Sequence, residues 1–398
     1  MPQPIEPLRI TQYTLTSALG RGVEAQRAAL LAERSGLRPC DFETAQLTAW
    51  IGRVEGLEEE KLTGNWKVFD CRNNRLARLA LEQDGFAAAL AAARGHYGAK
   101  RIGVFLGTST SGIHETEVAY RHLDPATGSL PPGFSYRHTH NVFATADFVA
   151  RYLGLEGPAS MISTACSSSA KVFGIAARHI ATGWCDAAVV GGVDSLCLTT
   201  LYGFTALQVV SPRACRPADA TRDGISLGEA AGFALLERAS PGAKGFALLG
   251  FGESSDAHHM SSPEPEGAGA ALAMQRALDP AGVGARDVDY VNLHGTATPA
   301  NDIAEDKAVC KVFGTQTPCS STKGWTGHAL GAAGISEAVI SLLAMQEGWL
   351  PRSLNTEHVD PGIRARVLLE SVRRPVARVL SNSFGFGGNN CSLLLGRL

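Results

Sequence analysis

Short apolar runs alternate with longer stretches of helical apolar spacing along most of the chain. Apolar runs of about four to eight residues favour buried strands, and apolar residues recurring every three or four positions favour helices. In the first half, strands are therefore predicted at Leu8–Thr14, Ile102–Gly107, Ala159–Ile162, Ala187–Asp194 and Ala230–Leu236. Helices are predicted at Gly22–Glu33, Asn73–Ala93, Lys171–Ile180 and a segment ending near Tyr152.

The second half continues the same alternation. Strands are predicted at Phe246–Leu249, Val288–Leu293, Val376–Leu380 and Cys391–Leu395, and helices at Ala268–Ala277, Asp302–Phe313 and Gly331–Met345. Strands that alternate with helices indicate a layered α/β fold. The Ser-Pro-Gly segment after Ala239 is the best boundary, and it divides the chain into residues 1–239 and 240–398. No sequence repeat relates these two parts.

Several regions do not follow the alternation. Residues 37–65 and 124–141 are mixed and irregular, and residues 208–228 are rich in proline, arginine and aspartate. Such composition is typical of loops, so we expect residues 208–228 to wrap around the surface. Residues 381–390, which follow the strand predicted to end at Leu380, are also interpreted as a loop.

The composition is that of a globular protein with little excess charge. Hydrophobic residues make up 45% and charged residues 19% of the 398 positions, and the formal net charge is −2. This charge gives no electrostatic basis for binding nucleic acid or an anionic membrane, and no apolar run is long enough to cross a bilayer. The nine cysteines include no Cys-x-x-Cys pair, which favours reduced thiols and a cytoplasmic location.

Cys166 is the first candidate for chemistry. It lies in Ser163–Ala170, between a predicted strand and a predicted helix, and small residues on both sides leave its sulfur accessible. Unpaired N–H groups at the start of a helix favour a thiolate over a thiol. A single cysteine is more often a small packed core residue, so the interpretation of Cys166 depends on what surrounds it.

Three further segments carry reactive or permissive residues, of which two follow predicted strands and one lies ahead of a predicted helix. They are His294–Thr298, the segment containing Lys323 and His328, and Asn382–Gly388. Ligands of open α/β sheets bind at the carboxyl ends of strands, so we expect these segments to meet Cys166. Taken singly, His294 suits a hydrogen-bonded core, Lys323 a solvated surface and His328 a helix cap.

Other motifs point less clearly to a site. The pairs His138/His140 and His258/His259 have spacings that suit a metal, but no third ligand suggests itself, and loop histidines are the better interpretation. The run Gly385–Gly388 looks like a phosphate loop, yet a strand follows it instead of a helix. That order argues against dinucleotide binding, and no cofactor is predicted.

The four segments together resemble the β-ketoacyl-acyl carrier protein synthase family, in its elongating Cys-His-His branch. The resemblance covers nearly the whole chain and includes Phe69–Asn73, Asp223–Gly224, Leu227–Glu229 and Ser255–Met260. It implies a thiolase fold, in which two similar α/β halves form five layers (α-β-α-β-α). It also implies decarboxylative Claisen condensation of malonyl carrier protein with an acyl chain carried by the enzyme.

The resemblance assigns roles to individual residues. Cys166 matches the nucleophile that accepts the acyl chain, and the backbone N–H groups of Cys166 and Phe386 match the oxyanion donors. Phe386 also matches a gating aromatic residue. His294 and His328 match the pair that stabilises the enolate, and Lys323 matches the lysine that anchors a histidine. Glu305 matches a glutamate that is hydrogen-bonded to that lysine. The resemblance also implies a structural monovalent cation near Asn292, Glu337, Ser381 and Asn382.

The implied partners are acyl- and malonyl-loaded acyl carrier protein and a second synthase-like chain, in a homodimer or a heterodimer. Relatives usually have threonine where this chain has Asn389, and the strand at Leu8–Thr14 lacks a glycine-punctuated opening. Both departures suggest a divergent member of a polyketide or aryl-polyene pathway. An inactive chain-length partner is the alternative function, but such partners lose the nucleophile. A degradative thiolase is a third interpretation, but it needs a second catalytic cysteine near the C-terminus. The candidate there, Cys391, lies inside an apolar strand, which suits packing better than catalysis.

Overall fold

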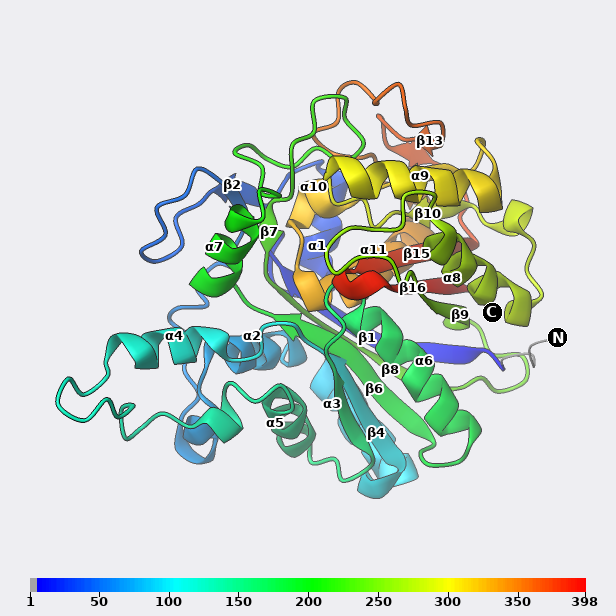
Figure 1. Cartoon of the computed structure of the whole chain (residues 1–398). Coiled ribbons are helices and arrows are strands. Elements are labelled where there is room, and N and C mark those ends of the chain that lie inside the picture. Colours follow the sequence, from blue (N-terminus) through cyan, green and yellow to red (C-terminus); the bar gives the residue numbers. More distant parts are fainter. Residues whose placement is uncertain (1–5) are drawn as a thin grey trace.

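One continuous hydrogen-bonded sheet of eleven strands runs through the computed structural model, which describes residues 6–398. Its strand order is β13-β11-β10-β15-β16-β9-β1-β8-β6-β4-β5. The two halves of this sheet meet where Leu8–Ile10 of β1 pair with Phe246–Leu248 of β9. Every strand predicted from the sequence is present, with longer bounds for several of them (Figure 1).

Apart from the edge strand β13, the sheet consists of two sets of five strands with the same order and the same directions. The first set is β1 (Leu8–Ser17), β4 (Ile102–Gly107), β5 (Ala159–Ile162), β6 (Ala187–Asp194) and β8 (Ala230–Arg238). The second is β9 (Phe246–Ser255), β10 (Tyr290–Asn292), β11 (Pro318–Ser320), β15 (Arg378–Gly385) and β16 (Asn389–Arg397). In each set the first three neighbours from the edge pair in parallel and the other two pairings are antiparallel. The chain is therefore duplicated in structure without a visible sequence repeat.

Helices form three layers around these strands, which gives the expected five-layered thiolase fold. In the middle, α6 (Ser168–Ala181) and α11 (Ala333–Glu347) contact each other and lie between the two strand sets. The helices α2 (Arg72–Leu81), α3 (Phe86–Tyr97) and α5 (Ala144–Leu153) cover the first set, and α8 (Ala268–Leu278) and α9 (Pro299–Phe313) cover the second. The helix α11 is buried on all sides, as its nearly uninterrupted apolar sequence predicts.

The remaining elements are short or peripheral. Helix α1 (Gly22–Leu31) packs on β1, and α10 (Lys323–Thr326) is a single turn. The short strands are β2 (Leu37–Pro39), β3 (Trp50–Gly52), β7 (Leu227–Gly228), β12 (Trp349–Leu350), β13 (Arg366–Val367) and β14 (Val372–Arg373). The sequence did not predict these strands, because two or three residues carry no periodic signal.

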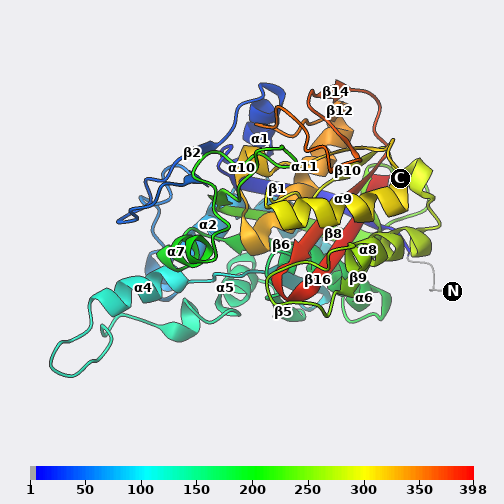
Figure 2. The same cartoon turned by 45° about the horizontal axis from the view of Figure 1, so that its top comes forward.

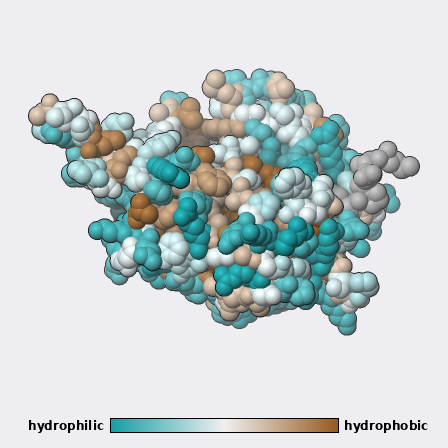
Figure 3. Space-filling view, turned by 90° about the horizontal axis from the view of Figure 1, so that it is seen from below, coloured by the Kyte–Doolittle hydropathy of each residue, from teal (hydrophilic) through white to brown (hydrophobic). Residues whose placement is uncertain are grey.

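An arm projects from the body beside the first strand set (Figures 1 and 2). It contains α4 (Ile113–Arg121), a loop and the 3-10 turn η3 (Tyr136–His138), and α7 (Leu198–Ala206) contacts its base. The helices α4 and α7 were not predicted from the sequence. Apolar atoms gather where the arm joins the body (Figure 3), and the arm exposes Tyr120, Tyr136 and Phe143.

Three sequence predictions of local structure are wrong. The single helix expected at Asn73–Ala93 is two helices, because Asp84 and Gly85 have left-handed φ values of 56° and 68°. Residues 208–228 do not merely wrap the surface, since Asp219, Arg222 and most of their neighbours are buried. The loop expected at 381–390 is a tight hairpin, in which only the 3-10 turn η7 (Phe386–Gly388) separates β15 from β16. The boundary at residues 239/240 lies between β8 and β9 and stays a prediction.

Candidate functional site

Cys166 lies in a tight turn between β5 and α6. Ala165 has a left-handed φ of 52°, and local hydroxyl groups stabilise this conformation. The Ser168 hydroxyl donates to the carbonyl of Ala165 (2.6 Å) and accepts the N–H of Thr164 (2.9 Å), while the Ser167 hydroxyl donates to the Thr164 carbonyl (2.9 Å). The serine-rich sequence thus directs Cys166 toward the strand ends.

The surroundings of Cys166 keep it a thiol at rest. Burial raises the pKa of Cys166 to about 12, while the charge of Lys323 and the backbone N–H of Phe386 lower it only in part. The expectation that the start of the helix yields a resting thiolate is therefore wrong. The reason is that Cys166 is only 6% exposed, and removing a thiolate from water is costly.

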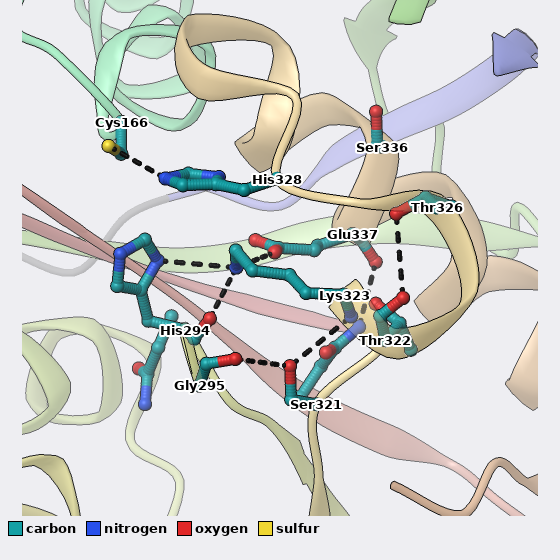
Figure 4. A network of polar contacts seen from close by, with 12 residues as sticks. Cys166, His294, Gly295, Ser321, Thr322, Lys323, Thr326, His328, Ser336 and Glu337 are labelled. Atoms are coloured by element: carbon teal, nitrogen blue, oxygen red, sulfur yellow. Dashed lines mark hydrogen bonds and ion pairs between the residues drawn. The ribbon is translucent and has the colours of Figure 1, made fainter. Parts of the chain in front are cut away.

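Two neutral histidines face the sulfur (Figure 4). The distance from His328 Nε2 to Cys166 Sγ is 2.9 Å, and the His294 and His328 rings lie 5.4 Å apart in an edge-to-face arrangement. Burial holds the pKa of both histidines well below the usual value, and the charge of Lys323 lowers both further. The expected meeting of Cys166, His294 and His328 is thus observed.

Lys323 fixes the orientation of His294. Its ammonium group donates to His294 Nδ1 (3.4 Å) and to the His294 carbonyl oxygen, and it forms an ion pair with Glu337 (Figure 4). Because Nδ1 of His294 accepts this bond, the neutral ring carries its proton on Nε2. Lys323 and Glu337 are both almost fully buried, so each compensates the charge of the other.

Glu305 does not have the partner expected for it. Its carboxylate accepts the backbone N–H groups of His294 (2.8 Å) and Gly295 (2.7 Å) and the side-chain amide of Asn382 (3.1 Å). The carboxylate on Lys323 is that of Glu337, from the first turns of α11. Burial raises the pKa of both Glu305 and Glu337 to about 7. A charged residue within the mostly apolar α11 was the signal that could have identified Glu337 as the partner of Lys323.

The oxygens near Glu337 fit the implied cation. Among residues 6–398, no hydrogen-bond partner serves the buried atoms Asn292 Oδ1, Glu337 Oε2, Ser381 Oγ and Ser383 Oγ. Asn292 and Ser381 face each other on adjacent strands, and buried oxygens without partners are costly unless a bound ion satisfies them. Asn382 differs from the other residues expected near the cation. Its side-chain nitrogen donates to Glu305, and its side-chain oxygen accepts a hydrogen bond from Ser392.

A cavity of about 140 Å³ opens beside Cys166, His294 and His328. Its apolar wall includes Phe204 and Phe386, whose ring centroids lie 5.8 Å apart. Its polar wall is made by residues with hydroxyl, amide or carboxylate groups: Asp256, Ser261, Ser262, Thr296, Thr298, Asn301 and Asn390. The sequence did not identify Phe204, since helix α7 was not predicted.

The other histidine pairs are not brought together as metal sites. His138 Nδ1 bonds to Ser135 Oγ and His140 Nδ1 to Thr116 Oγ1, each at 2.8 Å. Within the described chain, the one group of three potential ligands close enough to share a metal is Cys166, His294 and His328, with donor atoms within 4.8 Å. No helix from residue 6 onward is long and apolar enough to cross a membrane.

Comparison with known proteins gives consistent matches over the whole chain. Residues 72–242 match the family described as Beta-ketoacyl synthase, N-terminal domain, and residues 246–357 match Beta-ketoacyl synthase, C-terminal domain. The 3-oxoacyl-[acyl-carrier-protein] synthase 2 of Vibrio cholerae is 35% identical over 419 residues, covering 98% of each chain.

Solved structures agree with these matches. One chain in the structure of the ketosynthase ApeO with its chain length factor ApeC, from Xenorhabdus doucetiae, is 37% identical with a TM-score of 0.90, covering 99% of this chain and 98% of that one. A chain of the ishigamide ketosynthase/chain length factor is 29% identical with a TM-score of 0.87, covering 98% and 99%.

Proposed function

The chain belongs to the beta-ketoacyl synthase family, and we propose that it condenses malonyl-acyl carrier protein with an acyl chain held on Cys166. The observation that carries this proposal is the 2.9 Å contact between Cys166 Sγ and His328 Nε2, with His294 beside it. A nucleophile, two neutral imidazoles and an accessible cavity meet at one point, as a two-substrate acyl transfer requires.

The first step transfers the acyl group to Cys166. The sulfur attacks the thioester carbonyl of the loaded carrier, the carrier thiolate leaves, and the proton of Cys166 passes through His328 Nε2 to that thiolate. The N–H groups of Cys166 and Phe386 bind the oxyanion of the tetrahedral intermediate, because both lie at the sulfur. Since Cys166 is a thiol at rest, this proton transfer is part of the step.

The second step forms the carbon–carbon bond. Malonyl carrier protein loses carbon dioxide, and the resulting enolate oxygen accepts hydrogen bonds from His294 Nε2–H and from His328. Once Cys166 is acylated, His328 Nε2 no longer accepts a thiol proton, and the ring donates as its Nε2–H tautomer. The enolate carbon attacks the acyl carbonyl on Cys166, the C–S bond breaks, and the released Cys166 thiolate takes up a proton from solvent. Neutral imidazoles suit this role, because each carries one N–H that donates a hydrogen bond to the negative charge developing on the enolate oxygen.

Lys323 and its neighbours orient the histidines in this proposal. The ammonium group keeps the His294 proton on Nε2, and Glu305 fixes the backbone that carries His294. Asn292, Glu337, Ser381 and Ser383 would hold a monovalent cation, which would supply positive charge next to Glu337.

The carrier and the partner chain follow from the relatives. We propose acyl carrier protein as the carrier of both substrates, as in the printed names of the synthases it resembles. We further propose that the chain forms a dimer through the exposed aromatic residues of the arm and its junction with α5, Tyr120, Tyr136 and Phe143. The second chain is its own copy or a chain length factor such as that of ApeO. All nine cysteines are free thiols, which suits a reaction in the reducing cytoplasm.

Acyl transfer can be tested directly by intact mass. Incubation with acyl-acyl carrier protein of several chain lengths should add the mass of the acyl group to the wild-type chain and add nothing to Cys166→Ala. The same variant should still release carbon dioxide from malonyl-acyl carrier protein, because both histidines remain. No adduct with any chain length would contradict the proposed function, and the length series identifies the preferred acyl group.

A further inference from the structure

Lys171 and Asn389 form the side-chain contact that joins the nucleophile helix to the turn carrying Phe386. Lys171 is in the first turn of α6, and its ammonium donates to Asn389 Oδ1 at 3.0 Å. Asn389 is the first residue of β16, directly after η7. Within residues 6–398, this is the single side-chain hydrogen bond between α6 and residues 385–390.

The turn is attached on its other side to an exposed loop. Gly387 N–H donates to the Met260 carbonyl (2.7 Å), and the N–H of Asp256 donates to the Gly388 carbonyl (2.9 Å). Asn390 also donates to Asp256 (2.6 Å). Met260 is 78% exposed, so this side of the turn is anchored to a loop with little packing of its own. The anchor toward Cys166 is therefore Lys171.

Displacing this turn would affect one half of the reaction more than the other. Phe386 presents its N–H to Cys166 and its ring to Phe204 at the cavity. The histidines, in contrast, are held by Lys323 and Glu305 from different elements. A shift of the turn removes an oxyanion donor from the acyl transfer step and leaves the groups around the malonyl thioester in place.

We propose that Lys171 and Asn389 are positioning residues, a latch that holds the 386–388 turn over Cys166 for acyl transfer. This inference rests on the proposed function. Hydrogen bonds from a charged donor are stronger than neutral ones, which suits a contact that must hold a short turn closed.

The test compares variants that break the latch with one that keeps it. Lys171→Met and Asn389→Leu should each lower the single-turnover rate of acyl transfer to Cys166 about tenfold, the range expected for losing a charged hydrogen bond. The double variant should be no slower than either single one, because both remove the same contact. Asn389→Asp retains an acceptor for Lys171 and should stay within about twofold of the wild type.

Malonyl decarboxylation and thermal unfolding are measured on every variant. The latch predicts decarboxylation within about twofold of the wild type and intact folding in all four proteins. The proposal is overturned by unchanged acyl transfer in both single variants, by an equal loss of decarboxylation, or by multiplicative losses in the double variant. A wild-type chain that accepts no acyl group contradicts the proposed function instead, so the two failures are distinguishable.

Discussion

The two strand sets end in loops that are held in the same way but carry different chemistry. After β4, the N–H groups of Ser109 and Thr110 donate to the buried carboxylate of Asp194. After the corresponding strand β10, the N–H groups of His294 and Gly295 donate to the buried carboxylate of Glu305. Each loop is thus organised around one anion, yet only the second loop bears a side chain suited to proton chemistry.

The connections into the two central helices differ in length. Residues 163–167 lead from β5 to α6, whereas residues 321–332 lead from β11 to α11. The short connection places one reactive side chain, Cys166, at the helix start. The long connection contains α10 and has room for both Lys323 and His328. The comparison shows that the duplicated sheet supplies position, while loop length and loop residues decide which half brings the nucleophile and which brings the histidines.

The largest effect is expected from removing the ammonium group of Lys323. Lys323→Met leaves Glu337 buried without a partner, which should lower the free energy of unfolding by about 3–5 kcal/mol. Loss of the bond to His294 Nδ1 should lower malonyl decarboxylation about 100-fold, in line with the loss of a preorganised donor. Denaturant unfolding and carbon dioxide release measure the two effects separately.

The double variant Lys323→Met/Glu337→Met is the matched control. Replacing a buried ion pair by apolar side chains of similar volume is often neutral, so stability should return to within about 1 kcal/mol of the wild type. Decarboxylation should remain low. Recovery of decarboxylation together with stability would show that Lys323 acts only in folding.

Smaller effects are expected from changing the two carboxylates that hold these loops, Asp194 after β4 and Glu305 after β10. Asp194→Asn and Glu305→Gln each place an amide nitrogen opposite backbone N–H donors, which should cost about 2 kcal/mol of stability. Asp194→Asn should slow acyl transfer about tenfold, because Ser109 contacts the Ala165 carbonyl next to Cys166. Glu305→Gln should slow decarboxylation by a similar factor and leave acyl transfer unchanged.

Asp186→Asn provides the control for this pair of variants. Asp186 forms an exposed ion pair with Arg101, and exposed pairs contribute little. Its stability and both rates should stay near the wild-type values. If Glu305→Gln slowed acyl transfer as much as decarboxylation, the two loops would not act independently.

The sequence alone predicted nine of the eleven strands of the large sheet and the meeting of the site residues. The strand predictions depend on local patterns, and the meeting follows from the position of the reactive segments at strand ends. A strand covered on both faces, such as Ala187–Asp194, is apolar at nearly every position and needs no tertiary information. The split between α2 and α3 was not predictable in this way. The left-handed Asp84 is stabilised by bonds from the N–H of Val23 and the hydroxyl of Thr14, residues far away in the sequence.

The partners of buried charges could not be predicted for the same reason. Whether Lys323 meets Glu305 or Glu337 depends on how α9 and α11 lie relative to the 321–328 segment, and sequence spacing does not determine that distance. The duplication was equally hidden, because it lies in strand order and direction and not in matching side chains. The resemblance to a family named residues that the structure brings together, Cys166, His294, His328 and Lys323, but it assigned the wrong carboxylate to Lys323.

The smallest effect concerns pH and tests whether the histidines of the second half are neutral. Burial and the charge of Lys323 lower the pKa of His294 and His328 well below the usual value. As the pH falls below about 6.5, ordinary histidines would become charged, whereas these two should not. Glu337, with a pKa of about 7, gains a proton in this range, which leaves the charge of Lys323 less compensated and opposes protonation of the rings further.

The decarboxylation rate of Cys166→Ala with a malonyl pantetheine thioester should therefore change less than about twofold between pH 6 and 5. In this range Glu305 and Glu337, each with a pKa of about 7, are already protonated, whereas an ordinary histidine would lose most of its neutral form. A small thioester avoids the titration of a carrier protein, and thermal unfolding at each pH confirms that the fold is intact. A steep decline between pH 6 and 5 would mean that the rings are exposed to ordinary protonation. In that case Lys323 would not shield the histidines, and the contrast between a thiol at rest in one half and neutral imidazoles in the other would fail.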